Sequence, residues 1–209
     1  MMLIGTRNHK NIIAMNNYQK KRLMASAGIL FFTYLIIHML VNLNFLTGSD
    51  NFNNFYRWFH EAIILRWSVI GLLILGILFH VFTAVSRQLD SNSKRSITYK
   101  KPYPKAVPRL VAWGGASILF CFIVFHFFQM QGLETQDFYQ EVHAIFTNPI
   151  MLLIYALGFT TLAAHLHHAL NNVGQTFGLK QKHHQGLALA LVIFLVGGFV
   201  LIPINVLLF

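Results

Sequence analysis

The chain has 209 residues, of which 56% are hydrophobic and 11% charged, and its mean hydropathy is +0.55. This composition excludes an ordinary soluble domain and is typical of an integral membrane protein. The net charge of +10 raises the question of nucleic-acid binding. However, the basic residues lie in loops beside apolar runs and form no nucleic-acid motif, so we expect no nucleic-acid partner.

Five apolar runs are long enough to cross a hydrocarbon layer of about 30 Å as helices. Several are rich in Ile and Val, but open strands leave their backbone groups unsatisfied in lipid, so the sequence predicts helices. The first run has no clear small-residue cleavage site and is interpreted as a retained span. We therefore expect an all-α integral membrane protein with one domain over residues 1–209, a bundle with spans at about 24–46, 63–86, 109–130, 148–173 and 186–209.

The distribution of charge predicts the orientation of this bundle. Fourteen of the 16 Lys and Arg residues lie before the first span, between the second and third, or between the fourth and fifth. The opposite side holds only Arg57 and Arg66, together with five of the six acidic residues. By the positive-inside rule we expect a cytoplasmic N-terminus and a C-terminus outside.

Two polar segments on the outer side are predicted to cover that face. SDNFNNFYRWFHEAIILRW is amphipathic and is expected to lie at the membrane interface before the second span. LETQDFYQEVHAIFTNP predicts a short amphipathic helix that ends at Asn148-Pro149. On the cytoplasmic side, KKPYPKAVP has three prolines and predicts a break between the second and third spans.

Four of the spans carry a histidine in apolar surroundings, where a polar ring is costly and tends to mark function. At about 1.5 Å of rise per residue, His38 and His126 lie about 21 and 26 Å from the cytoplasmic ends of their helices. His80 and His165 lie about 9 and 12 Å from theirs. The sequence therefore predicts two histidine pairs at two depths.

Two imidazoles that face each other from two helices are the axial ligands of a b-type haem. Zinc would require three or four ligands at one depth. The absence of a C-x-x-C-H motif predicts that two haem b groups are held non-covalently. With both axial positions filled, such haems carry electrons. Cys121 is the one cysteine, so any iron–sulfur cluster belongs to a partner.

Small and basic residues lie near these histidines. Gly71, Gly76, Gly114 and Gly115 would leave room for a macrocycle, or would equally allow close helix packing. Arg87 follows His80 by two helical turns, so its guanidinium would either pair with a haem propionate or anchor the topology.

Several motifs together resemble one family. They are KKRLMASAG and IIHMLVNLNF in the first span, FHVFTAVSR closing the second, VFHFF in the third and AAHLHHALNNVGQTFGL closing the fourth. In order and spacing they resemble the cytochrome b membrane-anchor subunit of bacterial succinate:quinone oxidoreductases, the succinate dehydrogenases and fumarate reductases, of the single-chain five-helix dihaem type. The resemblance runs from about residue 18 to 180.

The resemblance implies a haem-bearing anchor in the bacterial cytoplasmic (inner) membrane. It would bind a flavoprotein subunit carrying FAD and an iron–sulfur subunit on the cytoplasmic face, and exchange electrons with membrane quinone. In the family the haem nearer the iron–sulfur subunit is held from the second and fourth helices and the distal haem from the first and third. This implies the pairs His80 with His165 and His38 with His126. The working direction depends on the quinone and the flavoprotein, so either succinate oxidation or fumarate reduction is implied.

The run AAHLHHALNN leaves a choice of ligand. Related anchors tend to carry a small residue, usually glycine, four residues after the ligand, and Ala169 takes this place after His165. His168 shares a face with His165 and is the alternative ligand or a propionate contact. His167 points about 200° away from that face and is expected to be a bystander.

Quinone reduction consumes two electrons and two protons, so its site needs a protonatable group near a haem. His60 and Glu61, just before the second span, are the candidates on the outer side, because an acid beside an apolar pocket can pass protons. Arg22, Ser26 and Arg87 form the rival cytoplasmic site.

Two other functions are kept open. One is the dihaem cytochrome b anchor of a hydrogenase or formate dehydrogenase. The other is a haem-free transporter or scaffold in which the histidines relay protons, which would predict acids near the membrane midplane.

Overall fold

The chain is helical throughout its described part. The computed structural model describes residues 17–93, 109–133, 137–178 and 181–209, which form seven α-helices, one 3₁₀ helix and no strand. In chain order these are α1 (Asn17–Asn42), η1 (Leu43–Thr47), α2 (Ser49–Glu61), α3 (Ile63–Ser93), α4 (Arg109–Gln131), α5 (Phe138–Thr147), α6 (Pro149–Thr176) and α7 (Gln181–Leu208). Five of them are long and apolar enough to cross a membrane, so the predicted all-helical chain with five spans is confirmed.

The spans extend beyond the predicted limits at several ends. They cover Tyr18–Thr47, Ile63–Leu89, Trp113–Gln131, Pro149–Thr176 and Gln185–Leu208. The first begins before residue 24 and the second continues past residue 86 because Lys and Arg favour helix, and their long stems can lie along apolar surface. The KKPYPKAVP break lies outside the described residues apart from its neighbour Arg109, where α4 begins.

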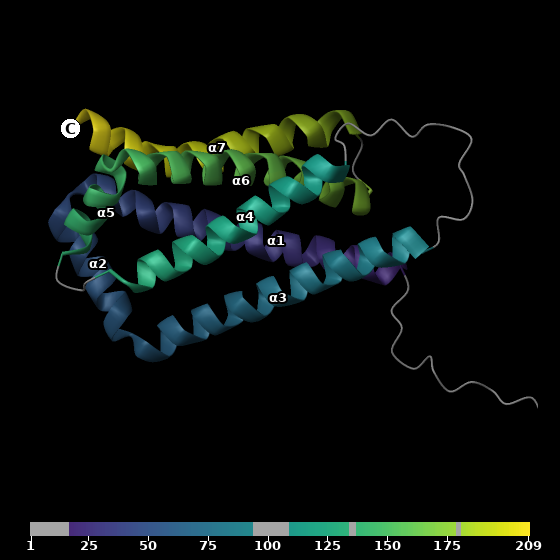
Figure 1. Ribbon diagram of the computed structural model, residues 1–209, viewed down its shortest axis with the longest axis horizontal. Helices are drawn as coiled ribbons and strands as arrows, with labels where there is room; N and C mark the ends of the chain where they lie inside the picture. The colour runs from purple at the N-terminus through teal and green to yellow at the C-terminus, as the bar shows by residue number, and fades with distance from the viewer. Residues whose placement is uncertain (1–16, 94–108, 134–136, 179–180) are drawn as a thin grey trace, which may run out of the picture.

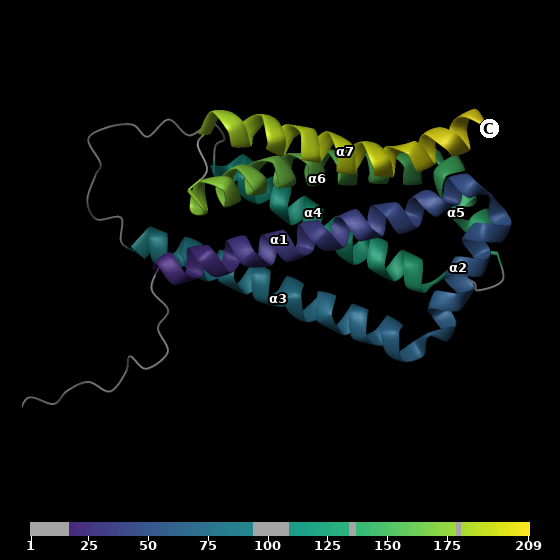
Figure 2. The same cartoon turned by 180° about the vertical axis from the view of Figure 1, so that it is seen from behind.

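The helices run between two ends that differ in structure. At the cap end, α2 and α5 lie across the bundle and the chain terminates (Figures 1 and 2). At the loop end lie the start of α1, the end of α3, the start of α4, the end of α6 and the start of α7. The cap helices α2 and α5 lie within the two polar segments predicted to cover one face, of which residues 134–136 lie outside the described residues and residues 63–67 belong to α3.

Amide and carboxylate groups fix the cap. Asn53 in α2 donates from Nδ2 to Asp137 Oδ1 at 2.9 Å and accepts from the backbone N–H of Tyr139 at 2.9 Å. Asp137 also accepts from the N–H of Gln140 and caps α5. The hydrogen bond from Asn53 and then that from Gln140 lower the pKa of Asp137, so its carboxylate keeps its charge.

The turn from α5 into α6 follows the predicted stop. Asn148 ends α5, and its Oδ1 accepts from the N–H groups of Ile150 and Met151, while Pro149 occupies the first turn of α6. Beneath the cap, the rings of Phe45, Phe52 and Phe138 are fully buried.

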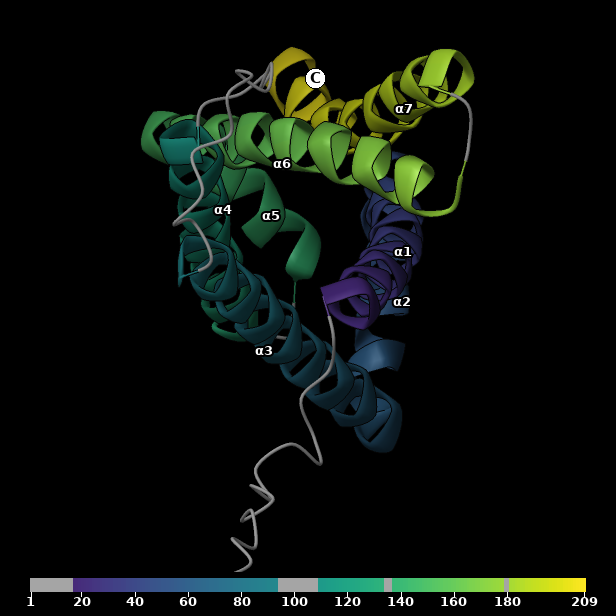
Figure 3. The ribbon, with the colours of Figure 1, turned by 90° about the vertical axis from the view of Figure 1, so that its right-hand side faces the viewer.

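The bundle is packed unevenly. Seen from the loop end, α1, α3, α4 and α6 surround its long axis, and α7 lies outside α1 and α6 (Figure 3). A buried cluster joins α1, α6 and α7 through Met39, Leu166 and Leu195. Helix α3 packs chiefly on α1, and in its described part only Thr83 is buried.

Gly198 allows α7 to approach α1. A Cβ atom at Gly198 would overlap the Sδ of Met39, which is 1% exposed, whereas a Cβ at neighbouring Gly197 meets no atom within 4 Å. We predict that Gly198→Ala destabilises the protein by about 1–3 kcal/mol through overpacking. Gly197→Ala, the matched control, should leave stability unchanged or slightly higher. Thermal unfolding in detergent measures both; equal midpoints for the two variants would contradict this packing.

Candidate functional site

The four predicted histidines lie on four helices and meet in two pairs. The ring centroids of His38 in α1 and His126 in α4 are 6.0 Å apart, with 68° between the ring planes. Those of His80 in α3 and His165 in α6 are 6.5 Å apart, at 71°. We name these the cap-side pair and the loop-side pair.

The two pairs lie at different levels of the bundle. His38 and His126 are four and five residues from the cap-end termini of α1 and α4, which is about 7 Å along the helix. His80 and His165 are 17 and 16 residues from the cap-end termini of α3 and α6, about 25 Å. The structure thus brings together the same rings that their depth along the helices predicts, His38 with His126 and His80 with His165.

Both pairs have the geometry of edge-to-face ring contacts, and their separations are also close to that of two rings on opposite sides of one metal. A metal–imidazole bond of about 2.0–2.1 Å, with the nitrogen about 1.1 Å from its ring centre, places two such centroids about 6.3 Å apart. The values of 6.0 and 6.5 Å lie on either side of this distance. Rings that share the nitrogen–metal axis can be twisted about it by any angle, so the observed interplanar angles are compatible with this arrangement.

A chain of hydrogen bonds determines which ring nitrogen of His126 carries the proton. Its Nδ1 lies 3.0 Å from the hydroxyl of Tyr155, and that hydroxyl donates to Oε1 of Gln129 at 2.7 Å. The Gln129 amide is oriented by its Nε2, which donates to the Sδ of Met151 at 3.6 Å. Tyrosine has one proton and uses it on Gln129, so Nδ1 of His126 must be the donor in the other contact. This tautomer leaves the lone pair of Nε2 free for a metal.

His38 is tied to the cap through a second chain. The Nδ2 of Asn42 donates to the backbone carbonyl of His38 at 2.7 Å and lies 3.2 and 3.4 Å from the ring nitrogens Nδ1 and Nε2. Tyr56 in α2 donates to Oδ1 of Asn42 at 3.0 Å, and burial raises the pKa of Tyr56, so this hydroxyl keeps its proton. If a ring nitrogen of His38 binds a metal, the metal must replace the contact of that nitrogen with Asn42.

These supporting residues were not predicted as site residues. Gln129 follows His126 by three residues and shares its helix face, which was a usable signal. Tyr155 comes from another helix. The only signal for it in the sequence was a polar hydroxyl group within an apolar span.

The loop-side pair has an unsatisfied atom. Nδ1 of His80 is buried and has no hydrogen-bond partner within the described residues. A buried ring nitrogen left in this way costs free energy, so this pair fits a site completed by a further group. The ring of His80 also meets the edge of Phe31, at a centroid distance of 5.7 Å.

Of the three clustered histidines, His165 is the one that faces His80. His168 is exposed, and its Nε2 lies 2.9 Å from the amide of Asn172 one turn later. His167 is also exposed and contacts Asn171 in the same way at 3.3 Å.

Glycines near the pairs serve two purposes. A Cβ at Gly76 would lie 3.0 Å from Cζ of Phe31, so this glycine permits close packing of α3 on α1. At Gly71, Gly114 and Gly115 such a Cβ would meet no neighbouring side chain or other helix within 4 Å among the described residues, and a flat group could approach the backbone there.

The predicted basic site lies at the loop end, where α1 and α3 meet. Nη1 of Arg87 lies 3.9 Å from the Sδ of Met24. Arg22 and Ser26, two residues to either side of Met24, are both exposed, and the guanidinium of Arg22 lies over the ring of Tyr18.

The predicted outer acid–base pair lies at the junction of α2 and α3. Nδ1 of His60 accepts from Nη1 of Arg66 at 2.7 Å, and the ring packs on Phe138. Burial and then Arg66 lower the pKa of His60, so the ring is neutral at pH 7. Glu61 is exposed and borders a groove of about 830 Å³ lined by Ala62, Ile63, Ile64, Leu65 and Ser68.

In the described part of the chain, no three His, Cys, Asp or Glu side chains converge to hold a metal ion. Comparison with protein-family models, curated proteins and solved structures gave no match.

Proposed function

We propose that this chain is the dihaem cytochrome b membrane anchor of a succinate dehydrogenase or fumarate reductase complex. It would pass electrons between an iron–sulfur subunit and membrane quinone. The observation that carries this proposal is the pairing of four histidines from four helices at two levels, with separations suited to one metal in each pair.

The chain's own residues would hold two haem b groups non-covalently. His38 and His126 would hold one and His80 and His165 the other, and the haems when bound supply one-electron oxidation and reduction. Tyr155 orients His126, while Tyr56 and Asn42 link His38 to the cap. Phe122 and Tyr155, which belong to the hydrophobic cluster under the cap, pack against the ring of His126.

Charge supports an orientation with the loop end in the cytoplasm and the cap outside. The membrane that we propose is the bacterial inner membrane. The loop end carries Lys20, Lys21, Arg22 and Arg87 among the described residues. This basic face would dock the iron–sulfur and flavoprotein subunits, which contain the iron–sulfur clusters and FAD. The cap-side pair is then the outer pair.

Quinone would bind beside Glu61 on the outer side. The groove next to Glu61 is apolar, and His60 nearby is a neutral base whose Nδ1 accepts from Arg66. Reduction of quinone to quinol takes two electrons, supplied from the iron–sulfur subunit, and two protons. Glu61 can relay protons from outside, and His60 would take up a proton at Nδ1 on release of Arg66. Arg22, Ser26 and Arg87 are the rival site.

Other functions have less support. A haem-free proton relay would use carboxylates near the midplane, and all six acidic residues of the sequence lie outside the five spans. One histidine from each of α1, α3, α4 and α6 supports the succinate dehydrogenase type over a hydrogenase or formate dehydrogenase anchor.

We predict that the purified protein contains two b haems per chain, measured by a haem assay and by the optical spectrum of the reduced protein. His38→Ala or His126→Ala should remove only the outer haem, and His80→Ala or His165→Ala only the other, because each iron loses an axial ligand. His167→Ala and His168→Ala are matched controls on α6 and should keep both haems. A colourless protein would contradict the proposed function, and loss of a haem in His168→Ala but not His165→Ala would contradict the ligand assignment.

We predict that Glu61→Gln lowers succinate-dependent quinone reduction by the assembled complex about 100-fold, because a proton donor is lost, while both haems remain. Asp50→Asn, an exposed acid at the start of α2, is the control.

Failure of the flavoprotein and iron–sulfur subunits to co-purify would contradict the proposed partners. An unchanged rate in Glu61→Gln would move the quinone site to Arg22, Ser26 and Arg87.

A further inference from the structure

Hydrogen bonding distinguishes His126 from His38 and His80. The Nδ1 of His126 donates to an oxygen that is itself fixed by a further bond, whereas Nδ1 of His80 has no partner in the described residues. His38 meets an amide nitrogen, which is a donor. Compared with His38 and His80, and within the described residues, only His126 thus has an acceptor for a ring N–H.

We propose that Tyr155 is a positioning residue that lowers the reduction potential of the haem held by the cap-side pair. This inference rests on the proposed function. Tyr155 acts through His126, because its hydroxyl oxygen accepts a hydrogen bond from Nδ1–H, and it does not itself touch the haem iron.

The physical reason is the electron density on the ring. A hydrogen bond from the far nitrogen of a ligating imidazole to an acceptor makes the ring more basic. A more basic ligand stabilises ferric iron more than ferrous iron, and the reduction potential falls. Donation from Tyr155 to Gln129 polarises the hydroxyl and makes its oxygen a better acceptor, so Gln129 should contribute to the same effect.

The position of the Tyr155 hydroxyl is fixed by packing. The residue is 4% exposed, and its ring meets those of Phe122, Phe146 and Phe159 at centroid distances of 5.3, 4.9 and 6.0 Å. Because these contacts hold the ring, Tyr155→Phe removes the hydroxyl while the ring keeps its neighbours.

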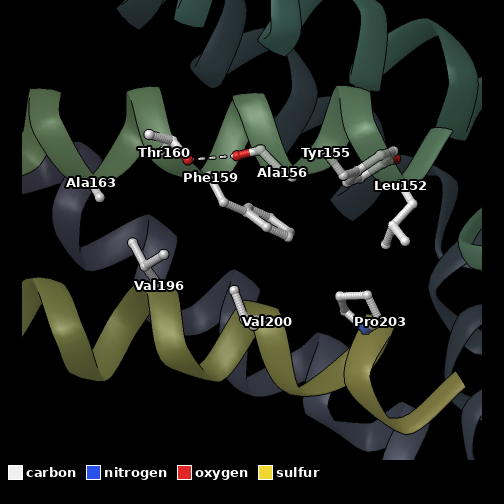
Figure 4. A pocket seen from close by; sticks show the side chains of 9 residues that line it. All are labelled: Leu152, Tyr155, Ala156, Phe159, Thr160, Ala163, Val196, Val200 and Pro203. Carbon is white, nitrogen blue, oxygen red and sulfur yellow. Dashed lines mark hydrogen bonds between the residues drawn. The ribbon is translucent and has the colours of Figure 1, made fainter. Parts of the chain in front are cut away.

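The same helix offers a matched control. Tyr155 and Thr160 both border an apolar groove of about 430 Å³ between α6 and α7 (Figure 4). The hydroxyl of Thr160 donates to the carbonyl of Ala156 in its own helix at 2.8 Å. Thr160→Val therefore removes one hydroxyl from α6 without touching a histidine.

The test is a potentiometric titration of the two haems in the purified complex, followed optically. The haem that is missing in His126→Ala identifies the cap-side component. Tyr155→Phe should raise the reduction potential of this haem and leave the reduction potential of the other haem unchanged. A tenfold weaker preference for ferric iron corresponds to about 59 mV in a one-electron couple. Gln129→Leu should give a smaller rise, and Thr160→Val none.

Each outcome is decisive. An unmoved cap-side potential in Tyr155→Phe, or an equal shift of both haems, would overturn the inference while leaving the proposed function intact. If Tyr155→Phe loses the cap-side haem, the shift is measured in Gln129→Leu. Loss of that haem in both variants, with Thr160→Val intact, would show a purely structural role and overturn the inference. A parent protein without haem would instead overturn the proposed function.

Discussion

An imidazole ring inside an apolar helix bundle costs free energy unless its nitrogens find partners, and the two histidine pairs must offset this cost. Four rings, each from a different helix, form the two pairs, whereas His167 and His168 in the same spans are exposed. The cost of burying the paired rings is met differently at the two levels. At the cap side, Tyr155, Gln129, Asn42 and Tyr56 supply hydrogen bonds. At the loop side, one nitrogen of His80 finds no partner in the described chain.

The packing of the bundle also differs between the cap-side and the loop-side pair. The close-packed core lies along α1, α6 and α7 and under the cap, where buried aromatic rings meet. Helix α3, which carries His80, packs chiefly on α1. The cap helices position the cap-side pair, since Tyr56 of α2 reaches Asn42 and the ring of Phe146 in α5 packs on Tyr155. Changes in the cap would therefore reach the cap-side pair through defined contacts.

Much of this arrangement could be predicted from the sequence because it depends on length and helical rise. Apolar runs of membrane length predicted five spans, and the distance of each histidine from its helix end grouped His38 with His126 and His80 with His165. Asn148-Pro149 predicted the stop between α5 and α6. Partners across helices could not be predicted, because rise along one helix carries no information on the rotation of another. Tyr155 is the main example. The choice between His165 and His168, three residues apart on one face, likewise needed the position of α3.

The central claim is that each histidine pair holds one haem iron. It is tested most directly by an electron cryomicroscopy structure of the purified complex. We predict planar density between the rings of His38 and His126 and between those of His80 and His165. The Nε2 of His126 should point to iron and its Nδ1 to Tyr155, and the iron–sulfur subunit should sit at the loop end. Rings in direct contact with no density between them, or an iron bound by His168, would contradict the account.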